Sequence, residues 1–268
     1  MNCPYCQSKT TRERRDKTCL GYKQYRCSDC GKQYNERTGT KLNFIEYPTE
    51  VVMIAMNYYY RFKGSLDDVV QLMEMRGFHL CHQTIHNWVQ TFGVELGLKL
   101  RARRKGKNGR KWNADATYIK IEGCWRYFYR EIDKNCGLID VYLSDVRNQA
   151  AAEAFFRQAQ NTTGITPEQS TTDKEKALYP AIKNVFGADT KHYDSKYMNN
   201  VIEQDHRGIK SRCKVMKGFK NIFCALKFCT VFEEIRQFFR MKNKSRAERL
   251  RMIAPKTIGF NELFTAMA

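Results

Sequence analysis

The sequence lacks long apolar runs and a secretory leader. No stretch approaches the roughly 18 consecutive apolar residues of a membrane-spanning helix. The first six residues, Met-Asn-Cys-Pro-Tyr-Cys, have neither the basic start nor the apolar core of a signal peptide. These absences predict a protein of the cytoplasm with no membrane partner.

Acidic residues are also scarce relative to basic ones. Lys and Arg number 47 against 28 Asp and Glu, a formal net charge of +19. Such an excess favours a polyanionic partner, and without a membrane segment the leading candidate is nucleic acid. The 268 residues suffice for about one to three domains with a sizeable core. Most of the eleven cysteines are expected to be buried or free thiols, because disulfides are rare in a reducing compartment.

Four of the cysteines form two CxxC pairs. Cys3 and Cys6 make the first, and Cys27 and Cys30 make the second, about twenty residues later. Two such pairs supply four thiolates to one tetrahedral ion, which predicts one structural Zn²⁺ in a zinc ribbon over residues 1–40. The ribbon is basic, so it is interpreted either as a DNA-contacting module or as a protein-docking knob. The alternative is four free cysteines in a disordered tail.

Residues 41–98 have the pattern of three helices. They are expected at Glu50–Phe62, Leu66–Arg76 and about Gln83–Phe92, and Gly77 ends the second. Helix, glycine-containing turn and helix is the order of a helix-turn-helix, although a plain three-helix bundle with a polar outer face fits equally well. We therefore predict a helix-turn-helix DNA-binding domain and keep the bundle as its alternative.

Two groups of residues near this domain are candidates for contact with DNA. The third helix carries polar side chains able to reach bases or phosphates, namely Gln83, Thr84, His86 and Asn87. Residues 99–110 are strongly basic and contain two glycines, which predicts a linker. Arg103, Arg104 and Lys105 are expected to follow the DNA backbone there, and the alternative is a linker that is simply solvated.

From residue 111 the pattern changes to alternating strands and helices, predicting an α/β domain over 111–241 followed by a basic tail over 242–268. Strands are expected at 111–122, 125–132, 138–143 and 170–172, with a short extended piece at His192-Tyr193. Helices are expected at about 150–159 and 176–185, from near Asn199, and over the apolar segment 223–241.

Three acids stand out in this domain. Asp115 interrupts the first strand, where alternation places it on the same face as Thr117 and Ile119. Asp173 ends the short strand, and Glu203 lies early in the helix that follows. A lone acid of this kind is most often solvated surface. Together, a strand, a strand end and a helix can supply three carboxylates to two divalent cations for phosphoryl transfer.

Basic residues follow Glu203 along its helix. His206 and Arg207 lie three and four residues later, on the same face, and Lys210 extends the stripe. A metal-binding acid followed by cations is what a helix beside a scissile phosphate requires, so these three are expected to contact DNA. Asp205 points about 160° away from Glu203 and is the rival ligand. The alternative is an ordinary Glu–Arg pair on a solvated helix.

The segments that carry these acids resemble the DDE transposases of prokaryotic insertion sequences, and most closely the group called insertion sequence six. The resemblance rests on Trp112–Lys120, on Thr172-Asp173 and on Asn199–Lys210, and the Arg76–Val89 segment resembles that group's helix-turn-helix. It covers about residues 45–240, and zinc ribbons precede this arrangement in some members. Together with the order of elements, it implies an α/β ribonuclease H-like catalytic domain behind the helix-turn-helix and the ribbon.

The resemblance also implies an activity. It is the metal-dependent cleavage and strand transfer of double-stranded DNA, at element ends and target, with Asp115, Asp173 and Glu203 as catalytic residues. Two Mg²⁺ or Mn²⁺ ions and a homodimer or larger assembly on DNA are implied as well, in a nucleoid-associated cytoplasmic enzyme. Two other functions remain open from the residues alone: a non-catalytic zinc-ribbon and helix-turn-helix regulator, and a ribonuclease H-like nuclease or resolvase.

Overall fold

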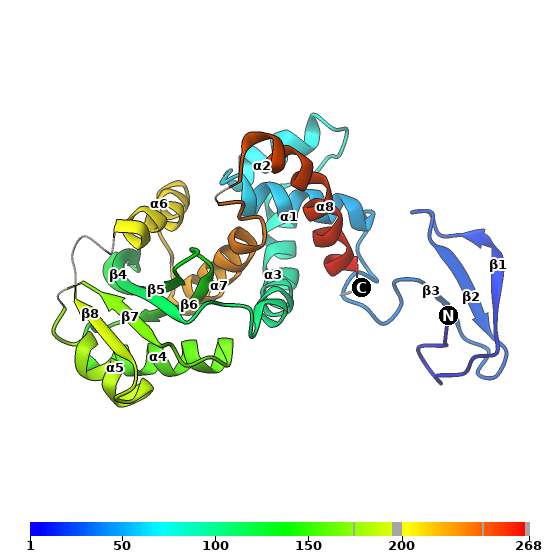
Figure 1. The fold of residues 1–268 in the computed structure, drawn as a ribbon. Coiled ribbons are helices and arrows are strands. Elements are labelled where there is room, and N and C mark those ends of the chain that lie inside the picture. Colours follow the sequence, from blue (N-terminus) through cyan, green and yellow to red (C-terminus); the bar gives the residue numbers. More distant parts are fainter. Residues whose placement is uncertain (174, 195–199, 243, 266–268) are drawn as a thin grey trace.

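The computed structural model describes residues 1–173, 175–194, 200–242 and 244–265. Figure 1 shows three parts in sequence order: a small sheet at the N-terminus, a group of helices in the middle and an α/β part at the other end. The small sheet stands apart from the rest of the chain in this view. None of the helices described is both long and apolar enough to cross a membrane.

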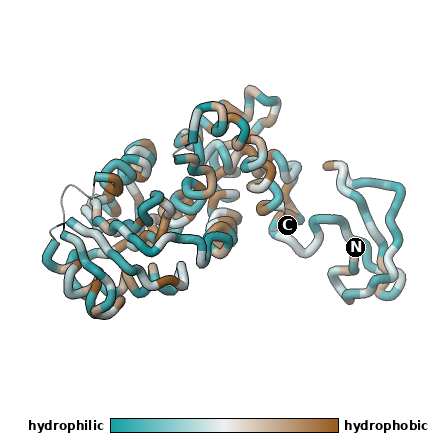
Figure 2. The backbone as a smooth tube through the Cα atoms, viewed as in Figure 1, coloured by the Kyte–Doolittle hydropathy of each residue, from teal (hydrophilic) through white to brown (hydrophobic). Residues whose placement is uncertain are grey.

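The N-terminal sheet has three antiparallel strands in the order β1-β2-β3, comprising Thr11–Lys17, Lys23–Cys27 and Gln33–Asn35. Its core is very small and consists of Cys3, Cys27 and Tyr34. Figure 2 shows that this part is mostly hydrophilic along its backbone. So small an apolar core does not stabilise a fold of this size unless something cross-links it.

The middle part contains the three helices expected from the sequence. They are α1 (Thr49–Arg61), α2 (Leu66–Glu74) and α3 (His82–Arg104). The start of α2 is set by a capping box, in which Ser65 accepts a hydrogen bond from the Asp68 amide and the Asp68 carboxylate accepts one from the Ser65 amide. The apolar side of α3 buries Ile85, Trp88 and Val89.

The predicted linker over 99–110 is wrong for its first half, because α3 continues to Arg104. Leu96 and Leu100 are buried one turn apart, and a Cβ on Gly97 would lie 3.1 Å from Val231. The helix thus packs closely against a neighbour that lies far away in the sequence. Ion pairs at Arg101 and Arg104 offset the charge repulsion from which a flexible linker was inferred.

The α/β part forms one five-stranded sheet in the order β6-β5-β4-β7-β8. Its strands are β4 (Lys111–Ile121), β5 (Cys124–Asp133), β6 (Leu138–Ser144), β7 (Gln169–Thr172) and β8 (Lys191–Asp194). The first three pair antiparallel, whereas β7 and β8 run parallel to β4. This order and these directions are those of a ribonuclease H-like sheet, which confirms the predicted fold class.

Helices cover both faces of this sheet. On one face, α4 (Gln149–Thr163) and α5 (Leu178–Phe186) enclose a core that includes Trp112, Ala114 and Phe155. On the other, α6 (Asn200–Val215) packs against β4 and α7 (Ile222–Phe238) against β6, over a core that includes Ile119 and Phe128. The predicted start of α6 near Asn199 falls outside the described residues.

The second core extends beyond the sheet. It is continuous with the apolar residues of α1, α2 and α3, and it includes Phe260, Leu263 and Phe264 of a C-terminal helix, α8 (Arg246–Thr265). The segment interpreted from sequence as a basic tail therefore includes a helix that packs on α1 and α3. The sequence hides this role because α8 buries only its last two turns, while residues 246–251 are exposed and basic.

Candidate active site

Asp115 and Asp173 lie level with each other on neighbouring strands. The parallel pairing of β4 with β7 ends with Asn113 beside Thr171, and each aspartate lies two residues further along its own chain. The Asp115 side chain is 12% exposed and that of Asp173 is 36% exposed, so both remain open to solvent. The structure brings the first two predicted acids together at the carboxyl end of β7, beside the middle of β4.

Glu203 reaches the same place from α6. It lines a cavity of approximately 560 Å³ together with Asp115, and Arg207 and Lys210 line the same cavity from later turns of the helix. Glu203, Arg207 and Lys210 are all exposed there. The three carboxylates do not form a tight ligand cluster. Within the described part of the chain, only the four cysteines do. Without a cation, three like charges repel one another.

The surroundings of Asp173 favour a cation. Partial burial raises the pKa of its carboxyl group, and the negative charge of Asp115 raises it further. Arg147 pairs with Asp173, and its Nη2 lies 3.7 Å from Asp173 Oδ2 but 2.6 Å from Glu175 Oε2. Arg147 is a site residue that sequence reasoning missed, since no motif marks it. Because Arg147 lies closer to Glu175, it offsets the charge of Asp173 only in part.

His206, predicted to contact DNA, lines the same cavity but is almost entirely buried beside Asp115. Its side chain is 3% exposed, and its Nε2 lies 3.2 Å from Asp115 Oδ2. The other oxygen of Asp115 accepts a hydrogen bond of 2.8 Å from the amide of Ala116. Helical spacing predicted that His206 shares a face with Glu203, and because α6 packs against β4 its ring contacts Asp115. His206 therefore orients Asp115.

Asp205 is buried in an ion-pair network on the opposite side of α6. It is 5% exposed and lies 2.5 Å from Arg130 of β5, 2.6 Å from Arg236 and 2.8 Å from Arg240. Glu233 of α7 is fully buried and pairs with Arg130 as well. This network ties α6 to the sheet and to α7, and so it fixes the helix that carries Glu203.

We expect Asp205→Ala to destabilise the protein by about 3–5 kcal/mol, because it removes the buried acid that three guanidinium groups share and leaves the buried Arg130 with Glu233 alone. Burial by itself would raise the pKa of Asp205. The positive charges of Arg130, Arg236 and Arg240 outweigh this effect and lower the pKa of Asp205 to about 2. Asp205 thus stabilises the fold fully above the unfolded pKa of about 4, and this contribution is lost as pH falls from about 4 to 2. Urea unfolding at neutral pH and at pH 3 measures both effects.

Glu203→Ala is the matched control for that experiment, since it removes an exposed acid from the same helix. Its free energy of unfolding should change by less than about 0.5 kcal/mol. Equal stability of the two variants at neutral pH would contradict the structural role of Asp205.

Comparison with known proteins identifies the chain's relatives. The profile of a family described as a DDE domain matches residues 109–242, half of the chain. The transposase of the insertion sequence-like element IS431mec, from Staphylococcus aureus strain NCTC 8325, is 34% identical over 178 residues, which cover 64% of this chain and 79% of the relative. The transposase of IS257 in transposon Tn4003 of Staphylococcus aureus matches to the same extent. The chain belongs to the DDE transposase family.

Among solved structures, the catalytic core domain of HTLV-2 integrase in complex with magnesium is similar to 53% of this chain. The match covers 97% of the integrase chain, at 17% identity and a TM-score of 0.41. The family assignment removes the non-catalytic regulator from the alternatives and makes the chain a polynucleotidyl transferase that acts in DNA transposition.

Outside the catalytic domain of this transposase, the four predicted cysteines come together. The sulfur atoms of Cys3, Cys6, Cys27 and Cys30 all lie within 4.8 Å of one another, and the Cys3–Cys30 and Cys6–Cys27 distances are both 3.6 Å. Four sulfurs at about 2.3 Å from a tetrahedral zinc lie about 3.8 Å apart, which agrees closely. Backbone hydrogen bonds, first from Cys30, lower the pKa of Cys27 to about 7 and favour its thiolate.

The predicted DNA-reading residues lie at the start of α3. Gln83, His86 and Asn87 are exposed, and Gln83 donates a hydrogen bond of 2.8 Å to Asn87. Thr84 is half-buried, with its hydroxyl 3.2 Å from the sulfur of Cys81. His79, His82 and His86 form no metal-ligand cluster in the described part of the chain.

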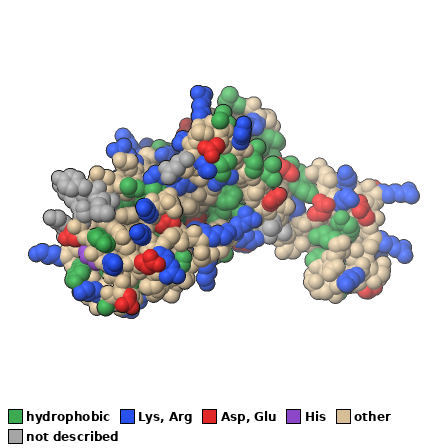
Figure 3. All heavy atoms as spheres, in the orientation of Figure 1, with side chains coloured by type: hydrophobic (Ala, Val, Ile, Leu, Met, Phe, Trp, Pro, Cys, Tyr) green, Lys and Arg blue, Asp and Glu red, His purple; other side chains and the backbone are tan. Residues whose placement is uncertain are grey.

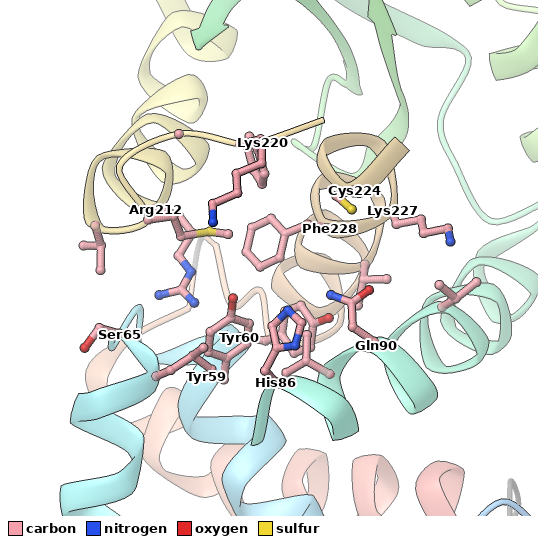
Figure 4. Close-up of a pocket in the computed structure, with 18 of the residues that line it drawn as sticks. Tyr59, Tyr60, Ser65, His86, Gln90, Arg212, Lys220, Cys224, Lys227 and Phe228 are labelled. Carbon is pink, nitrogen blue, oxygen red and sulfur yellow. The ribbon is translucent and has the colours of Figure 1, made fainter. Parts of the chain in front are cut away.

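His86 also faces the catalytic domain. With Gln90 it lines a groove of approximately 470 Å³ that α7 closes with Lys227 and Phe228, as Figure 4 shows. Lys220 of the loop before α7 points into the same groove. The polar side of α3 is therefore continued by cations from the catalytic domain, and Figure 3 shows Lys and Arg side chains on all three parts of the molecule.

Arg104 is a correction to the predicted DNA contacts. Its side chain is 11% exposed and forms two hydrogen bonds with Glu234, of 2.7 and 2.8 Å. It also donates to the carbonyl groups of Leu138 and Ile139. Its neighbours Arg103 and Lys105 are exposed. Arg104 holds α3 to the sheet and α7, and only the other two basic residues are free for a phosphate.

Proposed function

We propose that this transposase cuts DNA at the ends of an insertion sequence and joins them to a target, with Asp115, Asp173 and Glu203 as its catalytic carboxylates. The observation that carries the proposal is the level placement of Asp115 and Asp173 on parallel strands, with Glu203 facing the same cavity. The acids come from three segments that are far apart in the sequence, and their meeting in the fold supports a common role.

The carboxylates fit a pair of Mg²⁺ or Mn²⁺ ions, because they are oxygen ligands with incomplete neutralisation. Such ions supply activation of the attacking oxygen and stabilisation of the leaving oxygen. The chain's own residues orient the substrate. Arg207 and Lys210 hold the phosphates beside the cut, while His206 and the Ala116 amide keep Asp115 in position.

A strand-transfer assay tests this function. The full chain is incubated with duplexes that carry candidate element ends, taken from the DNA flanking its reading frame, in the presence of Mg²⁺ or Mn²⁺. We expect cleaved ends and ends joined to target DNA. Cleaved ends without any joined product would support a nuclease or resolvase instead. If neither cleaved nor joined ends form with any flanking sequence, the proposal is contradicted.

The remaining parts are proposed to bind and assemble. The cysteine cluster holds one structural Zn²⁺, and residues 41–98 bind double-stranded DNA at the element ends. The basic residues 1–40 either contact the same DNA or dock another protein. Two ends must be held together for joining, so the chain acts as a homodimer or larger assembly on DNA. It works in the cytoplasm at the nucleoid, because its substrate is chromosomal or plasmid DNA.

We expect different substitutions to weaken sequence-specific binding and general DNA binding. Replacing His86 and Asn87 by Ala should weaken binding to the element end by about 5- to 150-fold, because a good base contact contributes about 1–3 kcal/mol of discrimination. Binding to unrelated DNA should change little. Fluorescence anisotropy with both duplexes at several salt concentrations measures this.

Arg103→Ala with Lys105→Ala is the contrasting pair. We expect a uniform decrease in affinity for all sequences and a salt dependence flattened by about one unit of slope for each phosphate that is no longer neutralised. Identical behaviour of the two pairs would contradict the division between base reading and backbone binding.

A further inference from the structure

A second cavity adjoins the candidate active site and has a different chemistry. Its volume is approximately 520 Å³, and it lies between the β4–β5 hairpin and the C-terminal half of α6. Two aromatic and four basic side chains define what is called here the aromatic–cation groove. They are Tyr118, Lys120, Trp125, Lys210, Lys214 and Lys217.

Trp125 is the unusual member of the groove. Its side chain is 63% exposed, whereas the other two tryptophans of the chain, Trp88 and Trp112, are 5% and 0% exposed. Tyr118 is 46% exposed beside it. Exposure of large aromatic side chains to water is unfavourable, and it commonly marks a surface that a partner covers.

Backbone hydrogen bonds hold the hairpin that carries Trp125 in place. Trp125 pairs across the hairpin with Lys120, and the loop after α6 continues the sheet at this point. The Phe219 amide donates to the Lys120 carbonyl at 3.2 Å, and the Glu122 amide donates to the Phe219 carbonyl at 2.8 Å. A Cβ on Gly218 would lie 3.1 Å from the Lys120 carbonyl oxygen, so the loop approaches the strand closely. The groove is thus preformed.

The four lysines of the groove are exposed, and none forms an ion pair with an acid among the described residues. Lys210 and Lys214 lie one turn apart on α6, and Lys217 follows at its end. Such a concentration of uncompensated positive charge beside apolar rings suits a ligand with phosphates and flat bases.

The groove is continuous with the active site. Tyr118 and Lys210 line both this groove and the cavity that contains Asp115 and Glu203. On the other side, the Arg147 guanidinium donates to the Tyr118 hydroxyl at 3.4 Å and lies 3.7 Å from Asp173. A strand that leaves the carboxylates along α6 therefore enters the groove directly.

We propose that the aromatic–cation groove binds unpaired DNA next to the cut, with one base stacked on Trp125 and its phosphates held by the lysines. In a duplex the base faces are covered by their neighbours, so a ring can stack on a base only where the strand is open. The groove accordingly selects DNA whose end is frayed or already cut. This inference rests on the proposed function, because it takes the strand at the carboxylates to be the substrate.

Tryptophan emission gives a direct test with the full chain and no added Mg²⁺ or Mn²⁺. An oligothymidylate of about 12 nucleotides, within the usual site size of such grooves, should quench the exposed Trp125, whereas a duplex of equal length should quench it much less. Anisotropy with labelled oligothymidylate then gives the affinity of variants that lack the fluorophore.

Trp125→Ala should lower the affinity for the single strand by about 5- to 150-fold, the range that loss of one stacked base produces. Trp125→Phe should lose less, because it keeps a ring. Lys214→Gln with Lys217→Gln should weaken binding and flatten its salt dependence. Phe223→Ala and Lys191→Gln are matched controls, since Phe223 is 72% exposed and Lys191 is exposed, and neither lines the groove. Neither should change the affinity.

If Trp125→Ala binds the single strand with the affinity of the parent, the groove proposal is wrong. Equal quenching by the duplex and the single strand would also contradict it. The strand-transfer assay separates this result from failure of the proposed function. If the parent joins ends while Trp125→Ala binds single strands and joins ends equally well, the groove proposal is wrong and the function stands. If the parent joins no ends but loses single-strand affinity on substitution, the groove stands and the function is wrong.

Discussion

Asp115→Asn, Asp173→Asn and Glu203→Gln are each expected to reduce cleavage and strand transfer at least about 10³-fold, because each removes a charge worth several kcal/mol to the transition state. Binding to the element end should persist, since it rests on the helical part and the cations. Gel-shift and strand-transfer assays on the same preparations measure the two properties.

Asp189→Asn is the matched control for these substitutions. Asp189 is an exposed acid of the same domain, but it precedes β8 and so lies at the opposite end of the parallel strands from Asp173. It should retain parental activity. Full activity of all three carboxylate variants would remove the basis of the proposed mechanism.

Loss of the Zn²⁺ proposed for the cysteine cluster is expected to unfold the N-terminal sheet. The core of Cys3, Cys27 and Tyr34 is too small to hold three strands together, and structural zinc sites contribute on the order of 10 kcal/mol. The parent should carry one equivalent of zinc. Cys27→Ser should lose the zinc and make the first 40 or so residues sensitive to protease, while the rest of the chain stays folded.

Cys19→Ser serves as the control here. Cys19 is exposed and lies in the same sheet region, but its sulfur is not part of the cluster. Metal analysis and thiol titration distinguish the outcomes. A parent with four reactive thiols in the cluster and no zinc would show that the cysteines are not a metal site.

The affinity of the chain for the element end should also depend on whether zinc is bound. If the sheet contacts DNA, Cys27→Ser weakens end binding and the strand-transfer yield together. If it docks another protein, binding of purified chain to DNA stays at the parental value. The zinc experiment therefore also decides between the two interpretations of this basic module.

Several features of this protein were determined by local sequence. The two CxxC pairs, the capping box at Ser65 and the alternation around Asp115 each depend on neighbours a few residues away, so their spacing is sufficient to predict them. The three acids proposed as catalytic were predicted in the same way, with the help of the family resemblance. The order of strands and helices followed from their hydrophobic periods.

The sequence did not determine the pairings between distant segments. Residues 99–104 are basic enough to suggest a linker, yet Asp140 and Glu234 turn them into the end of a helix. His206 and Asp205 are adjacent in sequence, and only the packing of α6 between β4 and α7 makes one a partner of Asp115 and the other the centre of an arginine network.

Trp125 is the last example. In the sequence it is one more aromatic residue of a strand that also carries Tyr127, Phe128 and Tyr129. Its exposure results from the way the hairpin extends beyond β7 to meet the loop after α6. Strand periodicity specifies which residues share a face, but whether a face is covered depends on segments about 90 residues away, and only the tertiary structure brings them together.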